Sequence, residues 1–257
     1  MEAILDVINL SRNFGGLCAL SNVSFSVKSG EVLGLIGPNG SGKTTLFNVI
    51  TGIYHPSGGE VFFKGERIDG LEIHKIAGKG LCRTFQGTEI YRNLTVLENI
   101  KSPGYCKMKT GLLGVLIRTE SRKKQEEGLD DKALEILKFI GLYESRDLLA
   151  GNLPYGSQRL LGIGIGLFTE PELLLLDEPA TGMNPEETQI CTSLMGKIRN
   201  KGVTIIVVEH DMKVIMNLCD RIVVINSGLK IAEGRPEEIK KNKKVIDVYL
   251  GSEDAYS

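Results

Sequence analysis

The chain has 257 residues, enough for one large domain or for a domain with a smaller inserted unit, and either can bury a complete hydrophobic core. Its 31 lysines and arginines against 32 acidic residues give a net charge of −1, so it lacks the overall basic field of a nucleic-acid-binding protein. Its apolar runs are too short for a membrane helix, it begins without a signal-peptide pattern and its five scattered cysteines include no C-x-x-C pair, so we expect a cytosolic protein with reduced thiols.

The first part of the chain predicts an antiparallel sheet followed by a phosphate-binding loop. Phe25 and Val27 alternate with serines, as in a strand with one buried face. The apolar run 32–36 predicts a buried strand of parallel type, and residues 45–50 have the spacing of a helix. Between them, residues 37–44 read GPNGSGKT and match the pattern G-x-x-x-x-G-K-[ST].

This loop contains the residue types that hold a phosphate. Its glycines at 37, 40 and 42 let the backbone turn tightly and direct several N–H groups at one anion. Lys43 supplies a positive charge for the terminal phosphates, and the Thr44 hydroxyl can bind Mg²⁺. A glycine-rich surface turn is the simpler alternative, but the strand before the loop and the helix after it favour a phosphate site.

A second strand pair and a helical region follow the loop. Residues 58–65 form an apolar and aromatic run between glycines, which predicts further strands. From about 87 to 149 the sequence becomes charged and helical. Apolar residues at 133, 136, 137 and 140 share one helix face, and this helix is expected to end at Gly141.

Two later strands end in polar side chains. Four leucines at 173–176 run directly into Asp177 and Glu178, and the apolar run 203–208 leads to His210. Because the carboxyl ends of parallel strands meet at one edge of a sheet, we expect these side chains beside the phosphate-binding loop. Taken singly, the acids are also typical of a helix cap and the histidine of a capping or packing residue.

The remaining elements complete the chain. A helix should begin at Pro185 and carry Ile190, Leu194 and Ile198 on one apolar face. A hairpin is predicted over 221–232, and a last helix near 236. We expect one domain made of a core with antiparallel strands at about 1–86 and 166–235, a helical subdomain at 87–165, and a C-terminal helix and tail at 236–257.

The order of these motifs resembles that of the nucleotide-binding subunits of ABC transporters over nearly the whole chain. The matching segments are GPNGSGKTT at 37–45, TFQ at 84–86, LPYGSQ at 153–158, LLLLDEP at 173–179, TGMNP at 181–185 and VVEHD at 207–211. The resemblance implies an α/β fold with a P-loop NTPase core and parallel sheet, an antiparallel β subdomain and an inserted helical subdomain. It also implies hydrolysis of ATP with Mg²⁺.

The resemblance also implies roles for individual residues. Glu178, as general base, and His210, as a contact to the γ-phosphate, are the expected catalytic residues. Thr44, Gln86 and Asp177 are the expected Mg²⁺ ligands. The expected nucleotide-binding residues are Phe14, which would stack on adenine, and Gly37, Pro38, Asn39, Gly40, Ser41, Gly42, Lys43, Thr44 and Thr45.

Longer segments are similar to the ATP-binding subunits of branched-chain amino-acid importers. They are NFGGLCALSNVSF at 13–25, RTFQGTEIYRNLTVLENI at 83–100, DEPATGMNPEET at 177–188 and EGRPEEIKKNKKVIDVYLG at 233–251. The implied partners are a second ATPase subunit in a homo- or heterodimer, transmembrane permease subunits and, indirectly, an extracytoplasmic solute-binding protein, with the chain on the inner face of the cell membrane and no nucleic acid bound. Subunits for urea, for other amides or for lipopolysaccharide export are alternatives, as is a soluble ABC ATPase without a membrane partner.

One segment departs from the family pattern. In this family each ATP lies between the loop of one subunit and the signature LSGGQ of the other, but here the signature in trans reads Leu153, Pro154, Tyr155, Gly156 and Ser157. Proline has neither an N–H nor a hydroxyl, so donors expected at position 154 are absent. One interpretation is a weakened signature in an asymmetric dimer. The other is that the main-chain N–H groups of Tyr155 and Gly156 suffice.

Overall fold

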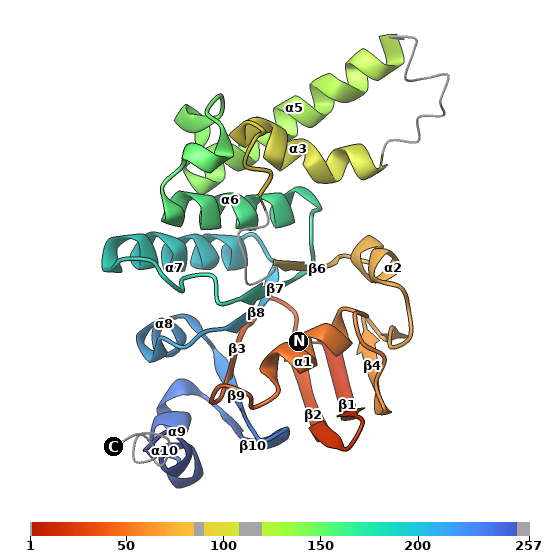
Figure 1. Cartoon of the computed structure of the whole chain (residues 1–257), viewed down its shortest axis with the longest axis vertical. Helices are drawn as coiled ribbons and strands as arrows, with labels where there is room; N and C mark the ends of the chain where they lie inside the picture. Colours follow the sequence, from red (N-terminus) through yellow and green to blue (C-terminus); the bar gives the residue numbers. More distant parts are fainter. Residues whose placement is uncertain (1, 85–89, 108–119, 251–257) are drawn as a thin grey trace.

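A six-stranded sheet forms the centre of the protein. The computed structural model describes residues 2–84, 90–107 and 120–250. Five neighbouring strands of the sheet are parallel and the edge strand β10 is antiparallel to β9, as Figure 1 shows. In spatial order the strands are β10 (Leu229–Gly234), β9 (Arg221–Asn226), β3 (Val32–Ile36), β8 (Thr204–Val208), β7 (Leu173–Asp177) and β6 (Leu81–Thr84).

The uninterrupted apolar runs of these strands are explained by burial of both sheet faces. Successive side chains of a strand point to opposite faces. Accordingly, Leu33 and Leu35 belong to one hydrophobic cluster, whereas Val32 and Ile36 belong to the other. The same division separates Leu174 from Leu175 in β7. The predicted parallel core is therefore confirmed, with a core of its own on each side.

A second, antiparallel sheet packs on one side of the central sheet. Its strands are, in spatial order, β2 (Leu17–Lys28), β1 (Ala3–Phe14), β4 (Gly58–Phe63) and β5 (Glu66–Arg67). Phe25, Val27 and Phe63 point into the hydrophobic cluster that also holds Leu33 and Leu35. The helix α1 (Lys43–Ile50) contributes Leu46, Phe47 and Ile50 to that cluster, and α2 (Ile73–Gly78) contributes Ile76.

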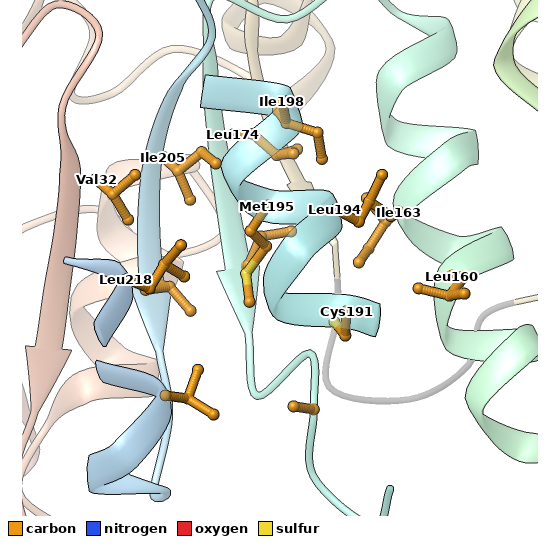
Figure 2. Close-up of a cluster of buried hydrophobic side chains, with 14 of the residues drawn as sticks. Val32, Leu160, Ile163, Leu174, Cys191, Leu194, Met195, Ile198, Ile205 and Leu218 are labelled. Carbon is orange, nitrogen blue, oxygen red and sulfur yellow. The ribbon is translucent and has the colours of Figure 1, made fainter. Parts of the chain in front are cut away.

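Helices cover the other side of the central sheet. Figure 2 shows α7 (Pro185–Asn200) between the strands and α6 (Tyr155–Phe168), with Leu194 and Met195 of α7 among the buried side chains. Beyond α6 lie α3 (Val96–Lys107) and α5 (Glu120–Ile140), at the top of Figure 1. The other helical elements on this side are η1 (Tyr143–Ser145), η2 (Ala150–Asn152), α8 (Met212–Leu218), α9 (Pro236–Lys240) and α10 (Lys243–Leu250).

Glycine in α6 allows its neighbours to approach closely. A glycine inside a helix costs ~1 kcal/mol relative to alanine. At Gly164, however, an added Cβ would lie 2.7 Å from the Cδ1 atoms of both Ile100 and Ile140, which belong to α3 and α5. A larger side chain would push those two helices away from α6. Packing of the three helices therefore explains the choice of glycine at this position.

The structure confirms most of the predicted elements and corrects one helix face. The helix α5 ends at Ile140 and Gly141 follows with φ of 79°, as the apolar spacing and glycine predicted. The helix α7 begins at Pro185, but Ile190 is 55% exposed and Cys191 is buried instead. Ile190 lies at the edge of the buried face of α7, which is formed by Cys191, Leu194, Met195 and Ile198. Among the described residues, no helix is both long and apolar enough to cross a membrane.

Candidate nucleotide-binding site

The loop between β3 and α1 is held by close contacts between backbones. Gly37 has φ of 155°, and an added Cβ would lie 2.0 Å from the carbonyl oxygen of Ile225 at the end of β9. Gly42 has φ of 109°, and its Cβ would lie 2.7 Å from the carbonyl oxygen of Ala19. Only glycine fits such conformations and distances without a shift of main chain. These glycines place the start of α1 so that its free N–H groups face a cavity.

This cavity has a volume of about 560 Å³ and contains most of the predicted nucleotide-binding residues. It is bounded by the phosphate-binding loop, by the antiparallel sheet, by the turn between β9 and β10, and by the residue that follows β7. Its lining residues are Phe14, Leu17, Cys18, Ala19, Asn39, Gly40, Ser41, Gly42, Lys43, Thr44, Thr45, Glu178, Ser227 and Gly228. Gly37 and Pro38 are not in the lining and lie beneath it, where their carbonyl groups accept hydrogen bonds from Lys43.

Lys43 is a buried cation at the floor of this cavity. Its Nζ donates to the carbonyl oxygens of Gly37 at 2.7 Å and Pro38 at 3.0 Å. Burial lowers the pKa of Lys43 from its usual value, while the charges of Glu178 and Asp177 oppose that shift. The electrostatic effect of both carboxylates on Lys43 fits the expectation that strand ends meet at one edge.

Glu178 and His210 form a pair at the carboxyl ends of β7 and β8. His210 Nε2 lies 2.7 Å from Glu178 Oε1, and the Glu178 side chain is 12% exposed. The Glu178 backbone has φ of 51° and its N–H donates to the carbonyl of Val208 at 2.9 Å. A positive φ is uncommon for residues other than glycine and is concentrated at functional sites. The strained turn directs the carboxylate into the cavity, where it can accept a proton from water.

Asp177 lies deeper and is paired with a cation. Its Oδ2 accepts from Nη2 of Arg83 at 2.7 Å, and the two side chains are 2% and 5% exposed. Arg83 belongs to β6, which is hydrogen-bonded to β7. The sequence prediction placed Asp177 at this edge but did not include Arg83, because a lone arginine in an apolar strand carries no motif.

The donor atoms of this site suit a Mg²⁺ ion that is bound together with phosphates. Mg²⁺ prefers oxygen ligands and is commonly held by one or two carboxylates, water and substrate phosphates. Thr44 lines the cavity, and the charge of Asp177 acts on Lys43, which lines it too. The third predicted ligand, Gln86, lies outside the described residues. Thr44 and Asp177 would therefore hold the ion, which when bound would neutralise charge on the terminal phosphates.

Phe14 stands at the other end of the cavity within an aromatic group. Its ring contacts that of Tyr54 edge to face, with centroids 5.2 Å apart. The Arg12 guanidinium carbon lies 4.6 Å from the Phe14 centroid and 5.5 Å from that of Tyr54. Phe14 nevertheless remains 37% exposed. A flat, partly exposed ring fixed in this way is suited to stacking against a planar base.

The signature segment lies outside this cavity, at the start of α6. Leu153 is buried, whereas Tyr155 is 45% exposed. The Tyr155 ring packs against Gly182, where an added Cβ would lie 3.1 Å from it, and Arg159 Nε donates to the Tyr155 hydroxyl at 3.0 Å. Pro154 is the N-cap residue of α6 and makes no side-chain capping hydrogen bond. Pro154 and Tyr155 are thus exposed at the start of the helix, whereas Leu153 and Gly156 are buried, and none of these residues lines the chain's own loop cavity.

Glu209 is a further buried group, and it is not among the site residues predicted from the sequence. Its Oε1 accepts from the N–H of Ala180 at 2.6 Å, and its side chain is buried. Burial raises the pKa of Glu209, against the effect of its hydrogen bonds from the backbone. This contact joins the residues before His210 to the segment after Glu178. No sequence signal would have identified it, since the contact depends on the order of β7 and β8.

Comparisons with known proteins agree with this geometry. The family model described as "ABC transporter" matches residues 20–181, and the model described as "Branched-chain amino acid ATP-binding cassette transporter" matches residues 230–255. The high-affinity branched-chain amino acid transport ATP-binding protein LivG of Salmonella typhimurium is 45% identical over 97% of this chain and 98% of that protein. BraF of Pseudomonas aeruginosa, which carries the same description, is 43% identical over 96% and 98%.

Solved structures give the same result. The ADP conformation of MJ1267, an ATP-binding cassette of an ABC transporter, matches with a TM-score of 0.86 and 34% identity over 98% of this chain and 100% of that one. A dimeric cassette, MJ0796 bound to ADP and Pi, matches with a TM-score of 0.75 and 25% identity over 90% and 98%. With its phosphate-binding loop, its paired acids and a family model that matches most of its length, the chain belongs to the ABC transporter family as an ATP-binding cassette.

Proposed function

We propose that this chain hydrolyses ATP, with Mg²⁺, to drive an importer of branched-chain amino acids. One observation carries the proposal: the Glu178–His210 pair lies at the loop cavity, with Glu178 and Lys43 in the same lining. A site that only bound nucleotide would need the loop but not a carboxylate directed at its phosphate end. The solute is inferred from relatives described as branched-chain amino acid transport ATP-binding proteins, which match nearly the whole chain.

Each residue has a role that follows from its position. The N–H groups of residues 39, 40 and 42–45 and the Lys43 ammonium would hold the phosphates, and Phe14 would stack on the base. Thr44, Gln86 and Asp177 would serve the metal ion. Glu178 would accept a proton from the attacking water, and His210 would orient Glu178 and contact the γ-phosphate.

The working unit we propose contains two cassettes, with the signature of each facing the loop of the other. The exposed residues at the start of α6, Pro154 and Tyr155, lie outside the chain's own cavity, which supports a role toward another nucleotide. A related cassette is described as dimeric in its ADP- and Pi-bound structure. The packing of Tyr155 on Gly182 would make the signature and the segment after Glu178 move together at that interface.

An exposed apolar patch is the proposed docking site for membrane subunits on the cytoplasmic face of the membrane. The patch consists of Tyr91, Leu94, Leu148 and Leu149, which are 61, 38, 51 and 45% exposed. Backbone hydrogen bonds from Val96 to Leu148 and from Ala150 to Leu94 hold these residues side by side. An apolar patch on a surface marks a contact site, and this one belongs to the proposed helical subdomain at 87–165.

A double substitution in this patch tests the function and its membrane partner together. In cells that lack their own copy of this gene, wild-type protein should restore uptake of labelled leucine but not of labelled urea. Leu148→Glu with Leu149→Glu should abolish uptake and co-purification with the membrane subunits, because charged side chains would be buried without partners. Binding of labelled ATP should remain unchanged, since the patch is not part of the cavity.

Two outcomes of this experiment would contradict different parts of the proposal. Uptake of urea in place of leucine would contradict the proposed solute, and full uptake by the double variant would contradict the proposed docking patch. Leu229→Glu is the matched control. Leu229 is 49% exposed, but it belongs to β10, in the hairpin formed by β9 and β10, and not to the patch. This variant should co-purify and transport as the wild type does.

The atypical signature gives a separate prediction. Pro154→Ser should raise ATP turnover of the assembled transporter, by up to about tenfold, because it restores an N–H and a hydroxyl at a helix N-terminus that we propose faces a phosphate. Turnover should be measured over a range of ATP concentrations. Pro154→Ala restores only the N–H and should give a smaller increase. Unchanged turnover in both variants would favour the alternative that Tyr155 and Gly156 already supply sufficient donors.

A further inference from the structure

Arg83 joins the two elements that carry the proposed metal ligands. Its Nη2 donates to Asp177 Oδ2 at the end of β7, at 2.7 Å, and its Nη1 donates to Asn48 Oδ1 in α1, at 2.6 Å. Asn48 follows Thr44 by four residues in the same helix, so the two side chains share one helix face. A single guanidinium thereby connects the helix face of Thr44 with the carboxylate of Asp177.

The surroundings of Arg83 keep its side chain in one position. It is 5% exposed, and its guanidinium carbon lies 5.4 Å from the centroid of Phe47, a fully buried ring in α1. A planar guanidinium held by these hydrogen bonds and by an aromatic neighbour has little freedom to rotate. Because Nη2 contacts Oδ2, it also fixes the rotation of the Asp177 carboxylate and thus the direction of Oδ1.

Two effects of this cation on a metal site can be separated. The charge-assisted hydrogen bond from Arg83 holds the carboxylate of Asp177 in one orientation. The same charge makes the site less negative and disfavours Mg²⁺ until a nucleotide triphosphate supplies its own negative charge. Removal of Arg83 would leave a buried carboxylate without its partner and free to change its orientation.

We propose that Arg83 is a positioning residue for Mg²⁺ in nucleotide binding, acting through Asp177, while its second contact, to Asn48 of α1, holds the guanidinium in place. This inference rests on the proposed ATP-dependent function but concerns only the metal requirement. Outer contacts that orient metal ligands typically change metal affinity by about 10–100-fold when they are removed. If Arg83 only connected β6 to β7, its removal would lower the stability of the fold and leave the Mg²⁺ requirement unchanged.

The test measures binding without hydrolysis. In the full-length Glu178→Gln protein, binding of a fluorescent ATP analogue should be titrated with Mg²⁺. Arg83→Met should raise the Mg²⁺ concentration for half-maximal binding by at least about tenfold. Binding in the presence of EDTA should stay within about twofold of that of the parent protein. Arg83→Lys keeps the charge but loses the planar fork, so we expect an intermediate shift.

Two further variants show whether the effect passes through Asp177. In an Asp177→Asn background, Arg83→Met should cause no additional shift in the Mg²⁺ requirement, as expected for two residues that act as a unit. Asn48→Ala should cause a shift of a few fold in the same direction, since it releases only one end of the guanidinium. An additional shift in the Asp177→Asn background would overturn the proposal.

Arg221 provides a control for the loss of a partly buried ion pair. It is 19% exposed, pairs with Glu31 and Glu233, and lies at the start of β9, at the opposite end of the sheet from Asp177. Arg221→Met should lower the melting temperature without changing the Mg²⁺ requirement. If Arg83→Met also lowers the melting temperature without changing the Mg²⁺ requirement, Arg83 has only a structural role and the proposal is wrong. If Arg83→Met does not fold, Arg83→Lys and Asn48→Ala decide in the same way.

The same titrations distinguish a failure of the proposed function from a failure of the role proposed for Arg83. Failure of the Glu178→Gln parent to bind the ATP analogue at any Mg²⁺ concentration would contradict the nucleotide site itself. Mg²⁺-dependent binding by the parent, with an unchanged requirement in all Arg83 and Asn48 variants, would contradict only the role of Arg83.

Discussion

Glu178→Gln should bind ATP as the wild type does and hydrolyse it about 10²- to 10⁴-fold more slowly, the range expected for loss of a positioned general base. The substitution keeps the size of the side chain and retains an oxygen 2.7 Å from His210 Nε2, so the cavity should keep its shape. It removes the carboxylate that accepts a proton from water. Turnover of the assembled transporter, together with binding of labelled ATP, measures both effects.

The same variant should trap the two cassettes in a closed, ATP-bound dimer, because the step that would reopen the dimer has been slowed. Size-exclusion chromatography with ATP and with ADP should separate the dimer from the single subunits. Glu186→Gln is a suitable control, since Glu186 is an exposed acid in the first turn of α7 and does not line the cavity. Turnover by Glu178→Gln within about twofold of the wild type would contradict the role we assign to this residue.

Gly37→Ala should produce the largest loss of stability of any single methyl addition in the loop. The new Cβ would lie 2.0 Å from the carbonyl oxygen of Ile225 and 2.7 Å from Ser41 Oγ, at φ of 155°. Main chain would have to move at either β3 or β9, and both are central strands of the sheet. We expect a loss of about 3–5 kcal/mol, a large share of the 5–15 kcal/mol of a typical domain.

Gly30→Ala separates the effect of this contact from that of the backbone angle. Gly30 has φ of 78°, but no heavy atom would lie within 4 Å of an added Cβ. Its substitution should therefore cost only the strain of a left-handed residue, about 1–2 kcal/mol. Urea denaturation of both variants gives the comparison. Equal losses for the two would mean that the Ile225 contact relaxes without cost.

The parts of the site that could be predicted were those fixed by local sequence or by a general rule of topology. The phosphate-binding loop is a local motif, and its flanking strand and helix are recognisable from their spacing. Glu178 and His210 follow strands, and strands of a parallel sheet deliver their ends to one edge. These positions required no knowledge of which strand lies beside which.

Other contacts depend on the spatial order of the strands and helices, which the sequence does not reveal. The pair of Arg83 and Asp177 exists because β6 lies beside β7, although the two strands are 94 residues apart at this contact. The hydrogen bond from Ala180 to Glu209 requires β7 beside β8 in the observed register. The need for glycine at 164 arises from two isoleucines in other helices. In each case the sequence around the residue holds no sign of its partner.

The backbone contacts at Ala19 have a consequence for which ligands the protein can accept. The Ala19 carbonyl of β2 meets both Gly42 of the loop and Gly228 of the turn between β9 and β10, at 2.7 and 2.8 Å from where a Cβ would be. Main-chain contacts thus help to hold the antiparallel sheet that carries Phe14 against the loop. The distance between Phe14 and the loop is therefore fixed. A shorter or longer ligand could be accepted only if the antiparallel sheet and the loop moved relative to each other.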